Sequence, residues 1–226
     1  MKAKSGETVV ITGDKATATK GKRKLFTYDR VERKSPTLGK KAPKGAKVLF
    51  GGIEMDRFSG GVKLDGELLE EGVVSLDSFG DFTLHLEFRT PYKPKTKPGS
   101  QDRGNSGVYI FNNYETQILD SFGIKGEFNF CGALYRKKPP AVNMCLPPLS
   151  WQTYDIQFTA PRFKEGKKIT NARITTRHNG VVIHDDFELD KGTGAGGGRP
   201  EKEKGQIHLQ GHGNPVRFKN IWLIEK

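Results

Sequence analysis

Residues 82–89 alternate strictly between apolar and polar side chains, and this pattern constrains the fold more than any other feature of the chain. The even positions hold Phe82, Leu84, Leu86 and Phe88, and the odd positions hold Thr83, His85, Glu87 and Arg89. A two-residue period places successive side chains on opposite faces of a β-strand. The segment is therefore predicted to be a strand with one face on a hydrophobic core and the other face open to solvent.

Shorter segments of the same kind follow one another along the chain, separated by turn residues. Two turns are expected at Asn112-Asn113 and at Asn179-Gly180, because these residues tolerate the positive φ of a tight hairpin. No window sustains the spacing of an amphipathic helix. Strands are expected at residues 48–50, 81–89, 107–111, 114–119, 151–159, 172–178, 181–189, 206–210 and 216–225. The sequence therefore predicts an all-β fold, an antiparallel β-sandwich.

The first 47 residues differ from the rest of the chain. Residues 7–33 resemble a set of short strands, and residues 35–47 are rich in Pro, Gly and Lys, as linkers often are. We therefore expect a basic, β-rich extension and linker over residues 1–47 and a main domain over residues 48–226. No apolar run approaches the roughly 20 residues of a membrane-spanning helix, and no secretory leader is recognisable after Met1.

Positive charge is concentrated in that same extension. The net charge is +12, yet residues 48–226 hold 24 basic and 22 acidic residues, so +10 of it belongs to residues 1–47. The tightest cluster is Lys20, Lys22, Arg23 and Lys24, and no aromatic residues alternate with it as in a single-strand nucleic-acid binder. A solvated basic face is favoured over a nucleic-acid or anionic-surface site.

The chain contains two cysteines, Cys131 and Cys145. A disulfide between them would close a 15-residue loop and contribute on the order of 3 kcal/mol in the chain-entropy model. The alternative is a pair of buried free thiols. A disulfide is favoured, and zinc is disfavoured because no second ligand pair stands at a metal-like spacing.

The polar positions of several strands are unusual for a solvent-facing sheet. They carry His, Gln, Glu, Arg and Tyr instead of the Lys, Ser and Thr of an ordinary surface, and such side chains bind polyhydroxylated ligands by directional hydrogen bonds. Aromatic residues could add platforms on which sugar rings stack. If all of these side chains face one way on one curved sheet, they form a single site. The candidates are Arg89, Asn105, Glu115, Gln117, Asp120, Tyr135, Trp151, Gln210 and His212.

Some of these candidates also have structural explanations. Glu115 and Arg89 could form a surface ion pair, which contributes less than about 1 kcal/mol. Asp120 stands at a strand end, where its carboxylate could hold the following loop by an Asx-type hydrogen bond. A structural calcium ion is conceivable in a sandwich, but Asp81, Asp120 and Asp185-Asp186 make no recognisable ligand set. No cofactor is expected.

Six sequence blocks, in order, resemble a known family. They are NSGVYI (105–110), YETQILDS (114–121), GALY (132–135), NMCLPPLSWQTYDI (143–156), RHNGVVIHDD (177–186) and LQGHGNPVRFKNIW (209–222). Together they are similar to the bacterial 3-keto-disaccharide hydrolase domain, over about residues 49–224. The resemblance implies a concanavalin A-like jelly-roll sandwich, an exported protein that is periplasmic or secreted, and substrates that are glycosides already oxidised to a ketone at C3.

The chemistry of such substrates suggests roles for the candidate residues. A C3 ketone acidifies the C2 proton, so a base can remove it and expel the C1 substituent, after which water adds back. With the resemblance as a guide, Glu115 is the expected base, Arg89 and Asn105 the donors to the enolate oxygen, and His212 the acid for the leaving group. Gln117 and Gln210 would bind sugar hydroxyls.

Two other functions remain open from the sequence. The same sandwich could be a non-catalytic carbohydrate-binding module, which needs amides and aromatic rings but no proton transfer. A structural domain tethered to an anionic envelope by its basic N-terminal segment is less favoured.

Overall fold

The structure is a computed structural model that describes residues 6–53, 56–60 and 64–226. It divides into two compact units, Met1–Arg33 and Lys34–Lys226. The predicted all-β class is confirmed, because the regular elements of the described residues are strands apart from the 3-10 turn η1 (Gly194–Gly196). None of the described residues form a helix that is long and apolar enough to cross a membrane.

The first unit is an antiparallel sheet of three strands, β1 (Glu7–Thr12), β2 (Lys15–Lys20) and β3 (Arg23–Asp29), in that order. Neighbouring strands neutralise part of its positive charge. Lys15 pairs with Asp29 at 2.6 Å, and Lys20 lies 3.9 Å from Glu7.

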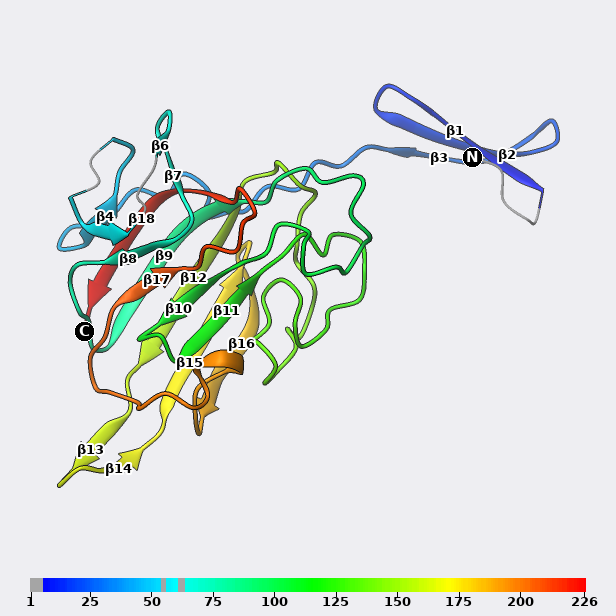
Figure 1. The fold of residues 1–226 in the computed structure, drawn as a ribbon. Coiled ribbons are helices and arrows are strands. Elements are labelled where there is room, and N and C mark those ends of the chain that lie inside the picture. The colour runs from blue at the N-terminus through cyan, green and yellow to red at the C-terminus, as the bar shows by residue number, and fades with distance from the viewer. Residues whose placement is uncertain (1–5, 54–55, 61–63) are drawn as a thin grey trace. The chain divides into compact units, whose positions relative to one another are not determined.

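The second unit is a sandwich of two antiparallel sheets (Figure 1). The smaller sheet has five strands in the order β11 (Tyr114–Ile118), β10 (Ser106–Ile110), β17 (Ile207–Leu209), β8 (Val73–Ser75) and β5 (Phe58–Gly60). The larger sheet has the order β16 (Val181–Leu189), β15 (Ala172–His178), β12 (Gln152–Thr159), β9 (Phe82–Arg89), β18 (Arg217–Glu225), β7 (Leu68–Glu70) and β6 (Leu64–Asp65), with β4 (Lys47–Phe50) also paired to β18. A separate hairpin joins β13 (Arg162–Lys164) to β14 (Lys167–Thr170).

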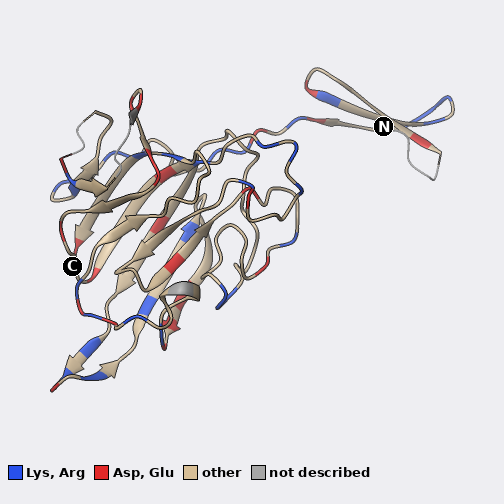
Figure 2. Ribbon diagram, viewed as in Figure 1, with Lys and Arg blue, Asp and Glu red and all other residues tan. Residues whose placement is uncertain are grey.

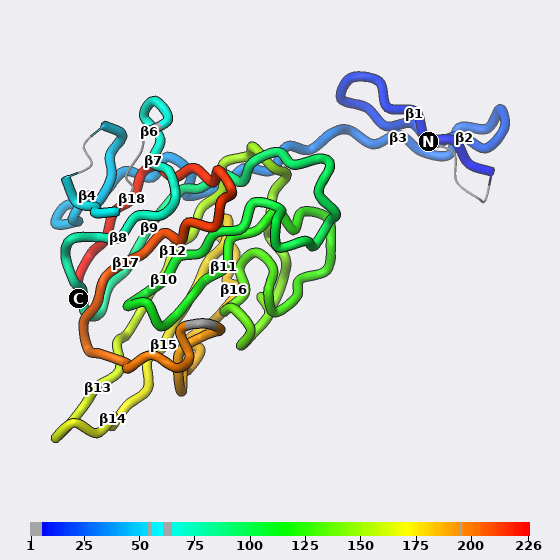
Figure 3. Tube along the Cα trace, in the orientation of Figure 1, coloured from blue at the N-terminus to red at the C-terminus, as the bar shows by residue number. Residues whose placement is uncertain are grey.

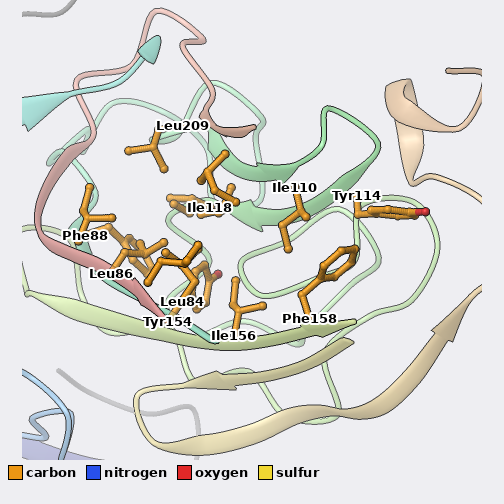
Figure 4. Packing of buried hydrophobic residues seen from close by; sticks show 14 of the residues in the cluster. Leu84, Leu86, Phe88, Ile110, Tyr114, Ile118, Tyr154, Ile156, Phe158 and Leu209 are labelled. Atoms are coloured by element: carbon orange, nitrogen blue, oxygen red, sulfur yellow. The ribbon is translucent and has the colours of Figure 1, made fainter. Parts of the chain in front are cut away.

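The hydrophobic core lies between these two sheets (Figure 4). Strand β9 contributes its even positions, such as Leu84, Leu86 and Phe88, all with no exposed surface. The smaller sheet contributes Ile110 and Leu209 from the other side. The alternation in the sequence therefore predicted the core face of β9 correctly, because every second side chain of a strand points to the same side.

The other face of β9 was predicted to be open to solvent, and this prediction is wrong. His85 and Glu87 are at most 1% exposed. Residues 35–40 cover them: Thr37 Oγ1 donates to Asp155 Oδ2 at 2.7 Å on the neighbouring strand, and the Gly39 N–H donates to Glu87 Oε1 at 2.6 Å. Residues 35–40 are thus part of the sandwich, and the division of the chain comes after Arg33 instead of after residue 47.

The hairpin turns are close to those predicted from the sequence. Asn179 and Gly180 both have positive φ, of 50° and 80°, between β15 and β16. Between β10 and β11 the positive-φ residues are Phe111 and Asn112, at 58° each, one position earlier than predicted. Two successive positive φ values give the turn the twist that antiparallel strands need.

A long coil connects β11 to β12 and folds beside the β10–β11 hairpin (Figure 3). An isolated bridge between Thr116 and Leu134 joins this coil to β11. Acidic and basic positions are interspersed over the sandwich (Figure 2), in agreement with the small net charge of residues 48–226.

The predicted disulfide is absent, because Cys131 and Cys145 are buried free thiols. Cys131 Sγ lies 3.3 Å from the Tyr154 hydroxyl, and Cys145 Sγ lies 3.5 Å from the Leu119 carbonyl oxygen. These hydrogen bonds satisfy the thiols within the core, so the coil 131–145 is held without a covalent link.

This arrangement predicts the reactivity of the two cysteines. In the native protein, both thiols are expected to resist a water-soluble disulfide reagent because both are buried. In guanidinium chloride without reductant, two thiols per chain should react. A count of zero thiols until a reductant is added would instead establish a disulfide.

Candidate functional site

The candidate site lies on the face of the smaller sheet that points away from the core. Tyr109 on β10 pairs with Glu115 on β11, and Gly107 pairs with Gln117. Paired residues point to the same side of a sheet. Because Val108 and Ile110 point into the core, the residues that alternate with them point outward.

These outward residues line a cavity of about 340 Å³. The strands supply its floor, and the loops around residues 135, 194 and 211 supply its walls. The lining residues are Asn105, Tyr109, Glu115, Gln117, Tyr135, Arg136, Gly194, Gln210 and His212. Six of them were singled out from the sequence, so segments distant along the chain do converge here.

Glu115 is the carboxylate of this cavity, and it is only 2% exposed. Burial raises the pKa of Glu115 to about 7, while a hydrogen bond from the Tyr109 hydroxyl acts in the opposite direction. Its Oε2 atom is buried and has no hydrogen-bond partner. A carboxyl group in this state exchanges a proton near neutral pH, as a general base must.

Gly107 leaves the space that this carboxylate occupies. A Cβ atom at Gly107 would lie 2.4 Å from Glu115 Oε1. Any larger residue there would have to displace the carboxylate, so the opposite strand needs glycine at this position.

Three amide side chains line the cavity together with this carboxylate: Asn105, Gln117 and Gln210. Gln117 Nε2 donates to Gln101 Oε1 at 3.2 Å and to Asn105 Oδ1 at 3.4 Å. The side-chain oxygens of Gln117 and Gln210 are buried and have no partner. A buried acceptor without a donor is costly, and hydroxyl groups of a bound ligand would supply the missing donors.

The glycine-rich loop at residues 192–198 fixes the backbone of Glu115. The Glu115 N–H donates to Thr193 Oγ1 at 2.7 Å, and Thr193 is itself fully buried. The Thr193 N–H donates to the Asn113 carbonyl at 2.8 Å. At Gly194, with φ of 38°, a Cβ atom would lie 2.4 Å from the Tyr135 ring.

His212 lies on an exposed loop at the cavity rim. Asn214 shapes this loop: its Oδ1 accepts the Gly104 N–H at 3.0 Å, and its Nδ2 donates to the His212 carbonyl at 3.2 Å. Arg136 also lines the cavity, and its guanidinium stands 5.4 Å from the centre of the Tyr135 ring.

Arg89 and Trp151 are not part of this cavity, contrary to the expectation of a single site. Arg89 is the last residue of β9, which belongs to the larger sheet. The even-numbered residues of β9 point into the core, so the side chain of Arg89 points away from it. The core therefore separates Arg89 from Glu115. Both Arg89 and Trp151 line a different hollow on the outer face of the larger sheet, so Arg89 cannot stabilise charge that develops beside Glu115.

Asp120 also lies outside the lining of the cavity. Its Oδ2 accepts from Arg103 Nε at 2.6 Å, and its Oδ1 accepts the Phe122 N–H at 3.3 Å. The second bond is the Asx-type contact considered from the sequence, and it holds the loop that follows β11.

Among the described residues, no three His, Cys, Asp or Glu side chains form a group that could hold a metal ion. Asp81 is paired with Arg162 at 2.6 Å, and Asp186 is paired with Arg173 at 2.7 Å.

Comparison with known proteins shows the family of this chain. Residues 45–224 match the 3-keto-alpha-glucoside-1,2-lyase-like domain. The chain belongs to this family. It is a carbohydrate-active domain, as the six sequence blocks and the polar cavity indicated.

Solved structures from Parabacteroides distasonis share the fold. One, described as a "putative glycosyl hydrolase", is 30% identical, with a TM-score of 0.72, and the match covers 82% of this chain and 86% of that one. A second protein with the same description is 17% identical with a TM-score of 0.59, covering 81% and 94% of the two chains. These matches confirm the predicted jelly-roll sandwich. No curated protein matches the sequence.

Several residues that line or support the cavity of this lyase-like domain were missed in the sequence. Tyr109 was not among the candidates from the sequence, yet its hydroxyl donates a hydrogen bond to Glu115. Arg136 lies in irregular coil, where strand alternation gives no direction for a side chain. Gly107 matters because Glu115 lies close to its Cα, and Thr193 matters because its hydroxyl accepts the Glu115 N–H. Both contacts join segments that are distant in the sequence or on different strands, so the local sequence pattern does not reveal them.

The raised pKa of Glu115 predicts a pH-dependent effect on stability. The buried protonated form is favoured, so this group stabilises the fold fully below its ordinary pKa of 4.5 and loses that contribution as pH rises through about 7. Glu115→Gln should therefore become more stable relative to the natural protein between pH 5 and pH 8, by about 3 kcal/mol at most. Unfolding in denaturant at several pH values measures this.

Glu165→Gln is a matched control, because Glu165 is exposed in the β13–β14 turn. Its stability difference from the natural protein should not vary over the same pH range. An equal pH dependence for Glu115→Gln and Glu165→Gln would contradict the raised pKa.

Proposed function

We propose that this domain cleaves 3-keto-glycosides, with Glu115 as the base that removes the proton at C2. The observation that carries the proposal is a single carboxylate, buried and with a pKa of about 7, in a cavity otherwise lined by amides, phenols, Arg136, His212 and a glycine. An ordinary glycosidase needs two facing carboxylates. Among the described lining residues, Glu115 has no such companion.

The reaction uses this one carboxylate in a balanced sequence. The C2–H bond breaks, its proton goes to Glu115, and its electron pair forms the enolate of the C3 ketone. The electrons then form the C1–C2 double bond while the C1–O bond breaks, and the leaving oxygen takes a proton from His212. In the last step, the oxygen of water and one of its hydrogens would add to C1, Glu115 would return its proton to C2, and the other hydrogen of water would restore the proton of His212, which gives a net hydrolysis.

The enolate oxygen requires donors that replace the Arg89 of the earlier expectation. Asn105 suits this role, because its carbonyl oxygen is engaged by Gln117 Nε2 and its amide nitrogen is left to donate. Arg136 supplies the positive charge on the cavity wall. Donors that are already in place stabilise developing charge without reorganisation.

The remaining amides would recognise the sugar. The unpartnered oxygens of Gln117 and Gln210 accept hydroxyl groups, and the Tyr135 ring, held against Gly194, offers a stacking surface. The binding of a 3-keto-glycoside would thus satisfy acceptors that are unsatisfied in the free protein.

Glu115→Gln is expected to reduce turnover of a 3-keto-disaccharide by about a thousandfold, since general bases contribute factors of this order. The activity of the natural protein should rise as pH increases through about 7, because Glu115 must be ionised. Sugar release measured by chromatography across pH tests both points. The parent disaccharide without the ketone, used as a control, should not be cleaved.

A fully active Glu115→Gln variant would refute the assignment of the base. If the natural protein binds the 3-keto-disaccharide but releases no sugar at any pH, the domain is instead a non-catalytic carbohydrate-binding module.

His212→Gln tests the leaving-group acid. With a disaccharide, whose alcohol leaving group needs a proton, turnover should fall by about a hundredfold. With a 3-keto-glucoside of a nitrophenol, which leaves as a stable anion, turnover should change little. Equal losses on both substrates would assign His212 to binding instead of proton transfer.

A further inference from the structure

A second hollow, of about 450 Å³, lies on the outer face of the larger sheet. The strands that carry its central residues are β9 and β18, and the segments around residues 39–41, 51–52 and 67–68 form its rim. Its charged and aromatic lining consists of Lys41, Glu67, Glu87, Arg89, Trp151 and Lys219. The whole core of the sandwich separates this hollow from the Glu115 cavity.

Arg89 and Trp151 form the polar and aromatic centre of the hollow. The Arg89 guanidinium stands 5.2 Å from the centre of the Trp151 ring, and Lys219 Nζ stands 4.3 Å from the same ring. Within the described part of the chain, the guanidinium of Arg89 has neither a hydrogen bond nor an ion pair. A planar guanidinium held against a ring with its donors unused is suited to a carboxylate or sulfate.

Glu87 provides an acceptor at the base of the hollow. Its side chain is 1% exposed, and its Oε1 accepts from the Gly39 N–H at 2.6 Å and from Asn220 Nδ2 at 2.8 Å. Its Oε2 is buried and makes no hydrogen bond; the ion-pair partner Lys219 Nζ lies 3.5 Å away. This oxygen can therefore accept a hydroxyl group of a ligand.

The backbone of β18 is distorted at this place. The pairing of β18 with β9 shifts register between Lys219 and Trp222, and Asn220 has a φ of 46°, in the left-handed region. Bulges of this kind redirect side chains and are common beside functional sites. Here the bulge residues Lys219 and Asn220 both line the hollow.

We propose that this hollow is a second carbohydrate site, which binds a saccharide bearing a carboxylate or a sulfate. Arg89 and Lys219 bind the anionic group, Glu87 Oε2 accepts a sugar hydroxyl, and the half-buried Trp151 ring contacts the C–H face of the sugar. Three cationic residues against two carboxylates give the hollow an excess of positive charge. Such a site would hold an acidic glycan while the Glu115 cavity remains free.

Tryptophan fluorescence can test this proposal directly. The chain has two tryptophans, and Trp222 is only 2% exposed and stacked on His85, so a surface ligand should change the emission of Trp151. The probes are a glucuronate-containing disaccharide, a sulfated disaccharide and the neutral disaccharide of the same linkage. At least one anionic probe should bind, and the neutral probe should bind at least tenfold more weakly.

Two variants and one control make the result specific. Arg89→Met and Lys219→Met keep the length of each side chain and should each weaken binding of the anionic probe about tenfold, with melting temperatures near that of the natural protein. Glu115→Gln should bind the probe as the natural protein does, because it alters only the other face. This control also separates failure here from failure of the catalytic proposal.

Equal binding of neutral and anionic probes would overturn the proposal, as would unchanged affinity in folded Arg89→Met and Lys219→Met. Binding of inorganic sulfate as tight as that of the sulfated disaccharide would also overturn it, because the sugar would then contribute nothing. If neither anionic probe binds at millimolar concentration, the hollow is no saccharide site.

Discussion

The two-residue alternation of β-strands is the constraint on which the rest of this structure depends. In a sandwich of two sheets, it sends half of the side chains into one shared core and the other half to two separate outer faces. Leu86 of the larger sheet and Val108 of the smaller sheet both lie in the core, so the polar residues that alternate with them must end on opposite sides of the domain. The Glu115 cavity therefore lies on the outer face of the smaller sheet, and the hollow that contains Arg89 lies on the outer face of the larger sheet.

Burial then determines the chemistry of the first face. Loops that contain Tyr135, Gly194 and His212 enclose Glu115, and the loss of water raises the pKa of Glu115 to about 7. The same carboxylate on an open sheet would stay ionised and would be a weak base. The absence of a side chain at Gly107 leaves room for this carboxylate, and the hydrogen bond from the Glu115 N–H to Thr193 Oγ1 fixes its backbone. The enclosing loops therefore account for the raised pKa on which the proposed role of Glu115 as the base depends.

The second face is also covered in part, by residues 35–40. These residues bury His85 and Glu87, and His85 Nδ1 lies 2.7 Å from Asp155 Oδ1. Burial alone would lower the pKa of His85, but the carboxylates of Asp155 and Glu87 have the larger combined effect and raise it. Because Gly39 and Asn220 occupy one oxygen of Glu87, only the other oxygen remains for a ligand. The covering segment thus defines the boundary of the proposed second site.

Local pattern was sufficient for the longer strands of the sandwich, the sandwich class and most members of the cavity, but the short strands β5 to β8, β13 and β14 were not predicted. Residues 82–89, the Asn179-Gly180 turn and the outward direction of Glu115 and Gln117 all follow from alternation and turn chemistry, which act between near neighbours. Only the tertiary structure decided that Arg89 lies across the core, that Cys131 and Cys145 are free thiols, and that Tyr109 and Thr193 contact Glu115. The reason is physical: alternation gives each side chain a direction within its own strand, whereas the sheet that a strand joins and the loops that cover it depend on contacts between distant segments.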